Sequence, residues 1–227
     1  MIKEENNSIQ VMLIDDHPIV LNGIKNLLAG VQTIESVTEA SNGKDALLLL
    51  ENNNNVDLVI TDISMPEMDG IELTQIVKNK YPNIKVLILT VHNERGILKE
   101  ALFSGAEGCL LKNTSKKELL QAIHKIMDNG YYYCDEILTI ARDINKEEQS
   151  VVDEPSSLSK RELEVLELIL QGYSNKEIAE KLSISYHTVC SHRKNTMKKT
   201  GSNNISGLFS YAKKYNLFTS LFEDNGI

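Results

Sequence analysis

Five polar side chains follow the short apolar runs in the first half of the chain: Asp15 and Asp16 after VMLI, Asp62 after LVI, Thr90 after VLIL and Lys112 after CLL. Such runs are typical of parallel strands that helices cover on both faces. Because the carboxyl ends of parallel strands lie along one edge of a sheet, we expect these side chains to converge. Neighbouring carboxylates repel one another unless a cation lies among them, and Mg²⁺ is the expected cation. A lysine and a threonine suit a phosphoryl group on a carboxylate, so the pattern predicts magnesium-dependent phosphoryl chemistry.

The segments between these runs have the periodicity of amphipathic helices. We expect helices over 18–29, 43–52, 70–79, 94–104 and 115–128, and a strand nearer the sheet edge over 33–40. This alternation predicts an α/β fold with a doubly wound, five-stranded parallel sheet. Pro66 and the Asp69-Gly70 pair predict a turn behind Asp62.

The composition limits the class of protein. A chain of 227 residues with 41% hydrophobic and 25% charged residues is typical of one large or two ordinary globular domains. The start, MIKEENNSIQ, lacks the apolar segment of a signal peptide, and no apolar run approaches the ~18 residues of a membrane span, so we expect a cytoplasmic protein. Cys109, Cys134 and Cys190 are widely spaced and odd in number, which argues against a disulfide framework or a zinc site.

The net charge of −8 is unevenly distributed. Residues 1–156 have a net charge of −11, residues 157–222 a net charge of +5, and the last five residues −2. An acidic front and a basic back indicate a regulatory or catalytic domain joined to a module that binds a polyanion. The polar segment NKEEQSVVDEPSS indicates a linker. We therefore predict a first domain over 1–134, a linker over 135–156, a second domain over 157–222 and a tail over 223–227.

The second domain has the signals of a helix-turn-helix. Two capping boxes, Ser159 with Glu162 and Ser174 with Glu177, each predict the start of a helix. A short turn then leads to Ser185, which can cap a longer basic helix that ends near Thr200-Gly201. A short helix, a tight turn and a longer basic helix predict a small all-α domain that binds the major groove of DNA.

The third predicted helix of this domain separates its residues by face. Val189, Arg193 and Thr196 lie on one side. The opposite side carries a polar, basic outer row, made up of His187, Ser191, Lys194 and Lys198. Ser191 and Lys194 are best placed for base edges, whereas Arg193, Lys198 and Lys199 can contact phosphates. The full set of candidate DNA-binding residues is Lys176, His187, Thr188, Cys190, Ser191, Arg193, Lys194, Lys198 and Lys199.

Residues 1–134 resemble the receiver domain of two-component response regulators, through the DD pair at 15–16, D-x-x-M-P-x-M-D-G at 62–70, the threonine at 90 and G-A-x-G-x-L-x-K at 105–112. The resemblance implies a flavodoxin-like fold and a phosphoryl group accepted on Asp62 from a histidine kinase. It also implies that Thr90 and Lys112 respond to the phosphate. Mg²⁺ would be bound by Asp15, Asp16, Asp62 and the backbone carbonyl of Ser64.

Residues 157–217 resemble the LuxR-type DNA-binding domain, through L-S-x-R-E-x-E-V-L, G-x-S-N-K-E-I-A-x-x-L and T-V-x-x-H. This combination is that of the NarL/FixJ class and implies promoter binding as a dimer, with the fourth helix, roughly 203–215, at the dimer contact. Two positions depart from the families. Cys109 stands where many receivers have an aromatic switch residue, and Cys190 where a lysine is common.

These features predict a phosphorylation-controlled transcriptional regulator whose only catalysis is phosphoryl transfer to, and hydrolysis from, Asp62. One alternative is a phosphohydrolase or phosphotransferase of the haloacid-dehalogenase type, but that chemistry requires an aspartate two residues after the nucleophile, where this chain has Ser64. A second alternative is a protein that never accepts phosphate and regulates through protein contacts alone.

Overall fold

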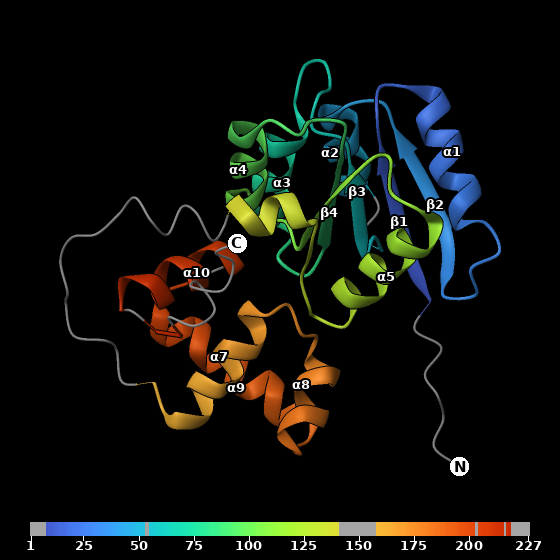
Figure 1. The fold of residues 1–227 in the computed structure, drawn as a ribbon. Helices are drawn as coiled ribbons and strands as arrows, with labels where there is room; N and C mark the ends of the chain where they lie inside the picture. The colour runs from blue at the N-terminus through green and yellow to red at the C-terminus, as the bar shows by residue number, and fades with distance from the viewer. Residues whose placement is uncertain (1–7, 53–54, 141–157, 203, 216, 219–227) are drawn as a thin grey trace, which may run out of the picture.

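The computed structural model describes the chain except for residues 1–7, 53–54, 141–157, 203, 216 and 219–227. It consists of an α/β domain followed by a smaller helical domain, as Figure 1 shows. The predicted tail at 223–227 and most of the predicted linker lie outside the described residues. Within the described residues, no helix is long and apolar enough to cross a membrane.

The first domain is built on a six-stranded parallel sheet in the order β2-β1-β3-β4-β5-β6. The strands are β1 (Ile9–Ile14), β2 (Ile34–Ala40), β3 (Leu58–Thr61), β4 (Lys85–Thr90), β5 (Gly108–Leu111) and β6 (Tyr132–Tyr133). The first five confirm the predicted sheet. The sixth was not predicted, because two residues are too short to show a strand pattern.

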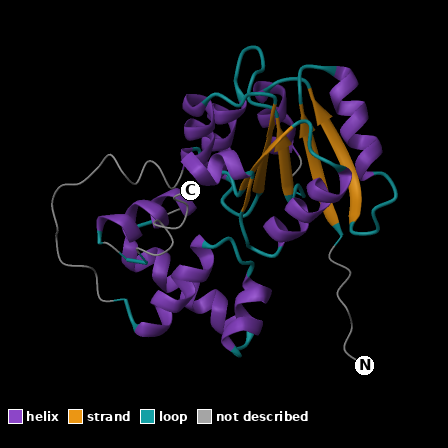
Figure 2. Ribbon diagram, viewed as in Figure 1, coloured by secondary structure: helices purple, strands orange, loops and turns teal. Residues whose placement is uncertain are grey.

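Helices cover both faces of this sheet (Figure 2). They are α1 (Pro18–Leu28), α2 (Gly43–Asn52), α3 (Gly70–Lys80), α4 (Arg95–Phe103) and α5 (Lys116–Met127). The apolar faces of α1 and α5 share one core cluster with the strands, and those of α2, α3 and α4 share the other. The doubly wound arrangement is therefore confirmed, and it places the ends of β1, β3, β4 and β5 at one edge.

The chain does not leave the first domain at Cys134. Residues 135–140, which the sequence analysis assigned to the linker, are helical. Ile137 and Ile140 on this helix are buried at 0% and 5% exposure. The start of the predicted linker therefore packs into the apolar core.

The helical domain contains α7 (Lys160–Leu170), α8 (Asn175–Leu182), α9 (Tyr186–Thr200) and α10 (Ile205–Lys214). Both predicted capping boxes are present, at Ser159 and Ser174. Ser183, which ends α8, has a φ of 52° in the left-handed region. This turn redirects the chain into α9, whose N-cap Ser185 accepts a hydrogen bond from the Thr188 amide. The helix-turn-helix is confirmed.

The two domains are in contact. One core cluster contains Tyr131 and Ile137 from the first part of the chain together with Leu166 and Val189 from the second. Figure 1 shows the helical domain lying against the end of the sheet that carries α5 and the segment after it. The predicted receiver domain and the predicted DNA-binding domain therefore pack against each other.

Candidate functional site

The carboxylates and the lysine predicted from the strand ends do converge. The Lys112 ammonium lies 2.6 Å from Asp15 Oδ2 and 2.9 Å from Asp62 Oδ2. Both carboxylates are nearly inaccessible, at 2% and 4% exposure. A single cation therefore joins the ends of β1, β3 and β5 and partly compensates two buried negative charges.

The protonation of Lys112 reflects this position. Burial by itself lowers the pKa of the ammonium group, but the hydrogen bonds and charges of Asp15 and Asp62 outweigh it and raise the pKa above the ordinary lysine value. Lys112 therefore stays cationic at neutral pH, as a group that binds a phosphoryl anion must.

The same edge of the sheet has capacity for a further cation. Asp62 Oδ1 and Asp16 Oδ1 are buried and have no hydrogen-bond partner. Asp16 Oδ1 lies 2.7 Å from His17 Nδ1, but without the geometry of a hydrogen bond. Oxygen atoms of Asp15 and Asp16 lie within 4.8 Å of each other and of a His17 nitrogen. An unpartnered carboxylate oxygen after the end of each of two neighbouring strands, β1 and β3, fits an oxygen-liganded divalent cation.

The turn behind Asp62 depends on a glycine. A Cβ atom on Gly70 would lie 1.8 Å from the Asp62 carbonyl oxygen, so the start of α3 can approach the acceptor strand only with glycine there. Asp69 caps α3 by accepting hydrogen bonds from the Ile71 and Glu72 amides at 2.9 and 2.8 Å. The Asp-Gly pair thus folds the loop back beneath Asp62, as the sequence predicted.

The loop after β4 places a histidine beside the acceptor strand. Thr90 is fully buried, and its Oγ1 accepts a hydrogen bond from the His92 amide at 3.0 Å. The His92 ring lies 2.7 Å from Ser64 Oγ through Nε2 and 3.3 Å from Glu94 Oε2 through Nδ1. Ser64, two residues after Asp62, and His92, two residues after Thr90, are therefore linked through their side chains.

Cys109 occupies a closed part of the sheet. Its side chain is fully buried, and burial raises the pKa of the thiol. Its partner in register on β6 is Tyr133, whose hydroxyl donates a hydrogen bond to the Ala106 carbonyl at 2.6 Å. A small buried thiol cannot rotate between the core and the surface as an aromatic side chain can.

The predicted DNA-binding residues of α9 fall into two groups. His187, Ser191, Lys194 and Lys198 are exposed, as the predicted outer row requires. Arg193 is only 9% exposed, and its guanidinium stacks over the Tyr131 ring at 4.7 Å and donates a hydrogen bond to Asn175 Oδ1 at 3.2 Å. In this arrangement Arg193 faces the first domain and not solvent.

The remaining candidates are more varied in their surroundings. Lys199 is exposed but pairs with Glu162 at 2.8 Å. Cys190 is half-buried and accepts a weak hydrogen bond from Asn175 Nδ2 at 3.4 Å. Lys176 and Thr188 lie near the starts of α8 and α9.

The segment after α5 contains functional candidates that the sequence analysis missed. The Lys176 amide, in the first turn of α8, donates a hydrogen bond to Asp128 Oδ2 at 3.2 Å. Asn129 Nδ2 donates to the Tyr186 hydroxyl at 3.3 Å, at the start of α9. The run of three tyrosines at 131–133 was the available signal, because large aromatic side chains contribute strongly to cores and interfaces.

Comparison with known proteins agrees with this geometry. A family model described as the response regulator receiver domain matches residues 11–124, and one described as bacterial regulatory proteins of the luxR family matches residues 156–212. The transcriptional regulatory protein MctR of Rhizobium johnstonii is 33% identical over 96% of this chain and 99% of its own length. The chain belongs to the response-regulator family. It combines a receiver domain with a LuxR-type DNA-binding domain, as the sequence predicted.

Other relatives of this response regulator have the same two-domain extent. The response regulator protein VraR of Staphylococcus saprophyticus is 36% identical over 92% of the chain and 98% of its own length. Among solved structures, the response regulator ChrA of a heme-sensing two-component system covers 93% of the chain and all of its own, with 33% identity and a TM-score of 0.52. A complex of the two-component response regulator RcsB with DNA covers 92% and 99%, with 30% identity and a TM-score of 0.55. The family is that of phosphorylation-controlled, DNA-binding transcription regulators.

Proposed function

We propose that Asp62 is the phosphoryl acceptor of this regulator. The observation that carries the proposal is the position of its carboxylate, with one oxygen held by Lys112 at 2.9 Å and the other buried without a partner. In the transfer, an Asp62 oxygen attacks the phosphorus of a kinase phosphohistidine, the phosphorus–nitrogen bond breaks, and the histidine keeps the electron pair. Lys112 then pairs with an oxygen of the new phosphoryl group, and the Thr90 hydroxyl at the end of β4 is the donor that we propose for a second oxygen.

Asp15, Asp16, Asp62 and the Ser64 carbonyl are the residues that we propose to bind Mg²⁺. The bound ion would neutralise the charge that an anionic donor brings to a carboxylate cluster. Without it, transfer to Asp62 requires two or three negative groups to approach one another in a buried site, where their repulsion is strongest.

Labelling with acetyl phosphate tests this assignment. The wild type is expected to gain one phosphoryl group with Mg²⁺ present, seen by intact mass, and Asp62→Ala or an excess of EDTA is expected to abolish it. Asp57→Ala, which removes a half-buried carboxylate at the opposite end of β3, is the matched control. Undiminished labelling of Asp62→Ala would contradict the proposal.

We further propose that the unphosphorylated receiver restrains DNA binding. The Asp128 carboxylate meets the first turn of α8 at the Lys176 amide, a position where a helix N-terminus favours a DNA phosphate. Asn129 meets Tyr186 at the start of α9, and base contacts come from that end of a recognition helix. The exposed row of α9 stays open, but the receiver occupies the approach to both helix starts.

Release of these contacts would let two copies bind adjacent half-sites as a homodimer. The exposed residues Lys176, His187, Ser191, Lys194 and Lys198 are then the proposed DNA contacts, together with Thr188, Cys190, Lys199 and, after the domains separate, Arg193. Because the proposed partners are a histidine kinase and promoter DNA, we propose that the regulator acts in the cytoplasm. Phosphorylation would change the Thr90 loop and the surface after β4 and β5, which shifts the balance between closed and open arrangements.

A further inference from the structure

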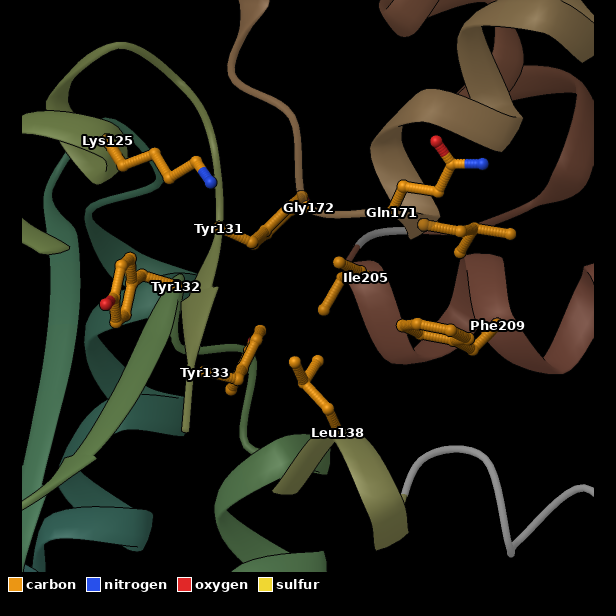
Figure 3. A pocket seen from close by; sticks show the side chains of 10 residues that line it. Lys125, Tyr131, Tyr132, Tyr133, Leu138, Gln171, Gly172, Ile205 and Phe209 are labelled. Atoms are coloured by element: carbon orange, nitrogen blue, oxygen red, sulfur yellow. The ribbon is translucent and has the colours of Figure 1, made fainter. Parts of the chain in front are cut away.

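A cavity lies at the junction of the two domains, away from the phosphorylation site. Its volume is about 170 Å³. Tyr131, Tyr133 and Leu138 line it from the receiver side, and Ile205 and Phe209 line it from the helical domain. Figure 3 shows these two sets of side chains facing one another across an open space. Neither domain forms the cavity alone.

The backbone keeps one wall of this cavity open. Gly172 follows α7 with a φ of +83°, and no heavy atom lies within 4 Å of the position that a Cβ atom would take there. Most of the lining is aromatic or aliphatic, and Lys125 and Gln171 are its polar side chains besides the tyrosines. A dry protein cavity of about 150 Å³ accommodates one benzene molecule, so this volume suits a single ring.

The cavity has one cation at its edge. Lys125 extends from α5 toward the Tyr131 end of the space, with its ammonium 5.9 Å from the centre of the Tyr132 ring. Among the described residues, no carboxylate forms an ion pair with Lys125 within 4 Å. The charge of Lys125 helps to lower the pKa of Glu177 on α8, but without an ion pair between them the ammonium can still contact an anion in the cavity.

We propose that this cavity binds a small monocyclic aromatic carboxylate, with the ring between Tyr133 and Phe209 and the carboxylate on Lys125. The ligand contacts both domains, so it binds the closed arrangement and not the separated domains. By linkage, it stabilises the closed arrangement and weakens DNA binding, as a second input beside phosphorylation. This effector role goes beyond the proposed function, although its effect on DNA rests on the closed arrangement described there.

Sodium benzoate is the probe. We expect saturable binding to the unphosphorylated full-length regulator with a Kd of about 1 mM, as suits nine non-hydrogen atoms in a small site. Saturation-transfer NMR measures this without phosphodonor or DNA. At a benzoate concentration tenfold above Kd, the apparent Kd for a DNA duplex should rise by up to about tenfold. Sodium acetate at the same concentration controls for ionic strength, and benzyl alcohol tests the ring without the charge.

Two variants, with a third as their control, decide whether the site is this cavity. Lys125→Met should weaken benzoate binding at least fivefold and leave benzyl alcohol unchanged, whereas Lys117→Met, exposed on the same helix, should change neither. Leu138→Trp fills the space and should abolish binding of both compounds. Any of three results would overturn the proposal. The first is no saturable binding of benzoate up to 20 mM, about 20-fold above the expected Kd. The others are equal benzoate affinity in all three variants and binding that leaves the DNA affinity unchanged. Failure of Asp62 labelling would leave the NMR result standing.

Discussion

Replacing Tyr131 should release the DNA-binding domain without any phosphodonor. The Tyr131 ring lies under the Arg193 guanidinium at 4.7 Å, and the two residues are only 8% and 9% exposed. A desolvated cation–π contact contributes about 2 kcal/mol. The hydrogen bonds from Lys176 to Asp128 and from Asn129 to Tyr186 in the same interface are long, at 3.2 and 3.3 Å, and exposed or only partly buried, so each contributes about 0.5–1 kcal/mol. The Arg193–Tyr131 pair is therefore the largest single polar contribution.

In the Tyr131→Leu variant, a leucine keeps apolar volume in the interface but leaves Arg193 without its ring. Loss of about 1.5–2 kcal/mol from the closed arrangement should raise the DNA affinity of the unphosphorylated protein roughly 10- to 30-fold, provided that the closed form predominates. Tyr131→Phe keeps the ring face but removes the hydroxyl that bonds to Arg193, so its DNA affinity should lie between those of the wild type and Tyr131→Leu. Both values are measured by fluorescence anisotropy on a duplex selected with the phosphorylated protein.

Phosphorylation supplies the internal control for this experiment. Once acetyl phosphate has opened the wild type, Tyr131→Leu has no remaining closed state to lose, and the three proteins should bind DNA with the same affinity. Thermal unfolding of each variant shows whether the fold is intact. If folded Tyr131→Leu binds DNA no more tightly than the wild type before phosphorylation, the interface does not restrain DNA binding and dimerisation alone must be the switch.

Three further changes test other parts of the molecule. Gly70→Ala should lower the free energy of unfolding by more than about 3 kcal/mol, measured by urea denaturation, because its methyl group overlaps a backbone oxygen next to the acceptor strand. The same change should reduce acetyl phosphate labelling. Gly23→Ala, where a methyl group meets open space, should have neither effect. The hydrogen bond from Lys199, the capping hydrogen bonds from Ser159 and the Lys199 charge together lower the pKa of Glu162 from its ordinary 4.5 to about 2. These contacts therefore stabilise the folded state above pH 4.5, and the stability is lost as pH falls toward 2. Glu162→Gln should flatten that part of the urea-midpoint profile, and an unchanged slope would contradict it. Lys194→Ala should weaken cognate DNA by about 1–3 kcal/mol and leave random DNA nearly unchanged, whereas Lys198→Ala should weaken both and lower the salt slope by about one unit, so identical salt titrations would refute the two roles.

Local signals in the sequence were sufficient for the elements and for the position of the site. Apolar runs and helical periodicity depend on residues within one element, so the five main strands and the receiver helices were predicted to within one or two residues at most of their ends. The capping boxes are equally local, since each joins a side chain to an amide three residues away. The edge that collects Asp15, Asp62 and Lys112 followed from the parallel topology alone.

Only the tertiary structure decided how these groups pair. That Lys112 bridges two carboxylates and leaves one Asp62 oxygen without a partner depends on the register of three strands. Arg193 shows the limit most clearly: helical periodicity placed it on the inner face of α9, but the sequence contains no information that this face meets Tyr131, 62 positions earlier. Contacts between distant segments depend on how whole domains pack, where many weak apolar and polar contributions add, and no periodicity within one segment encodes that sum.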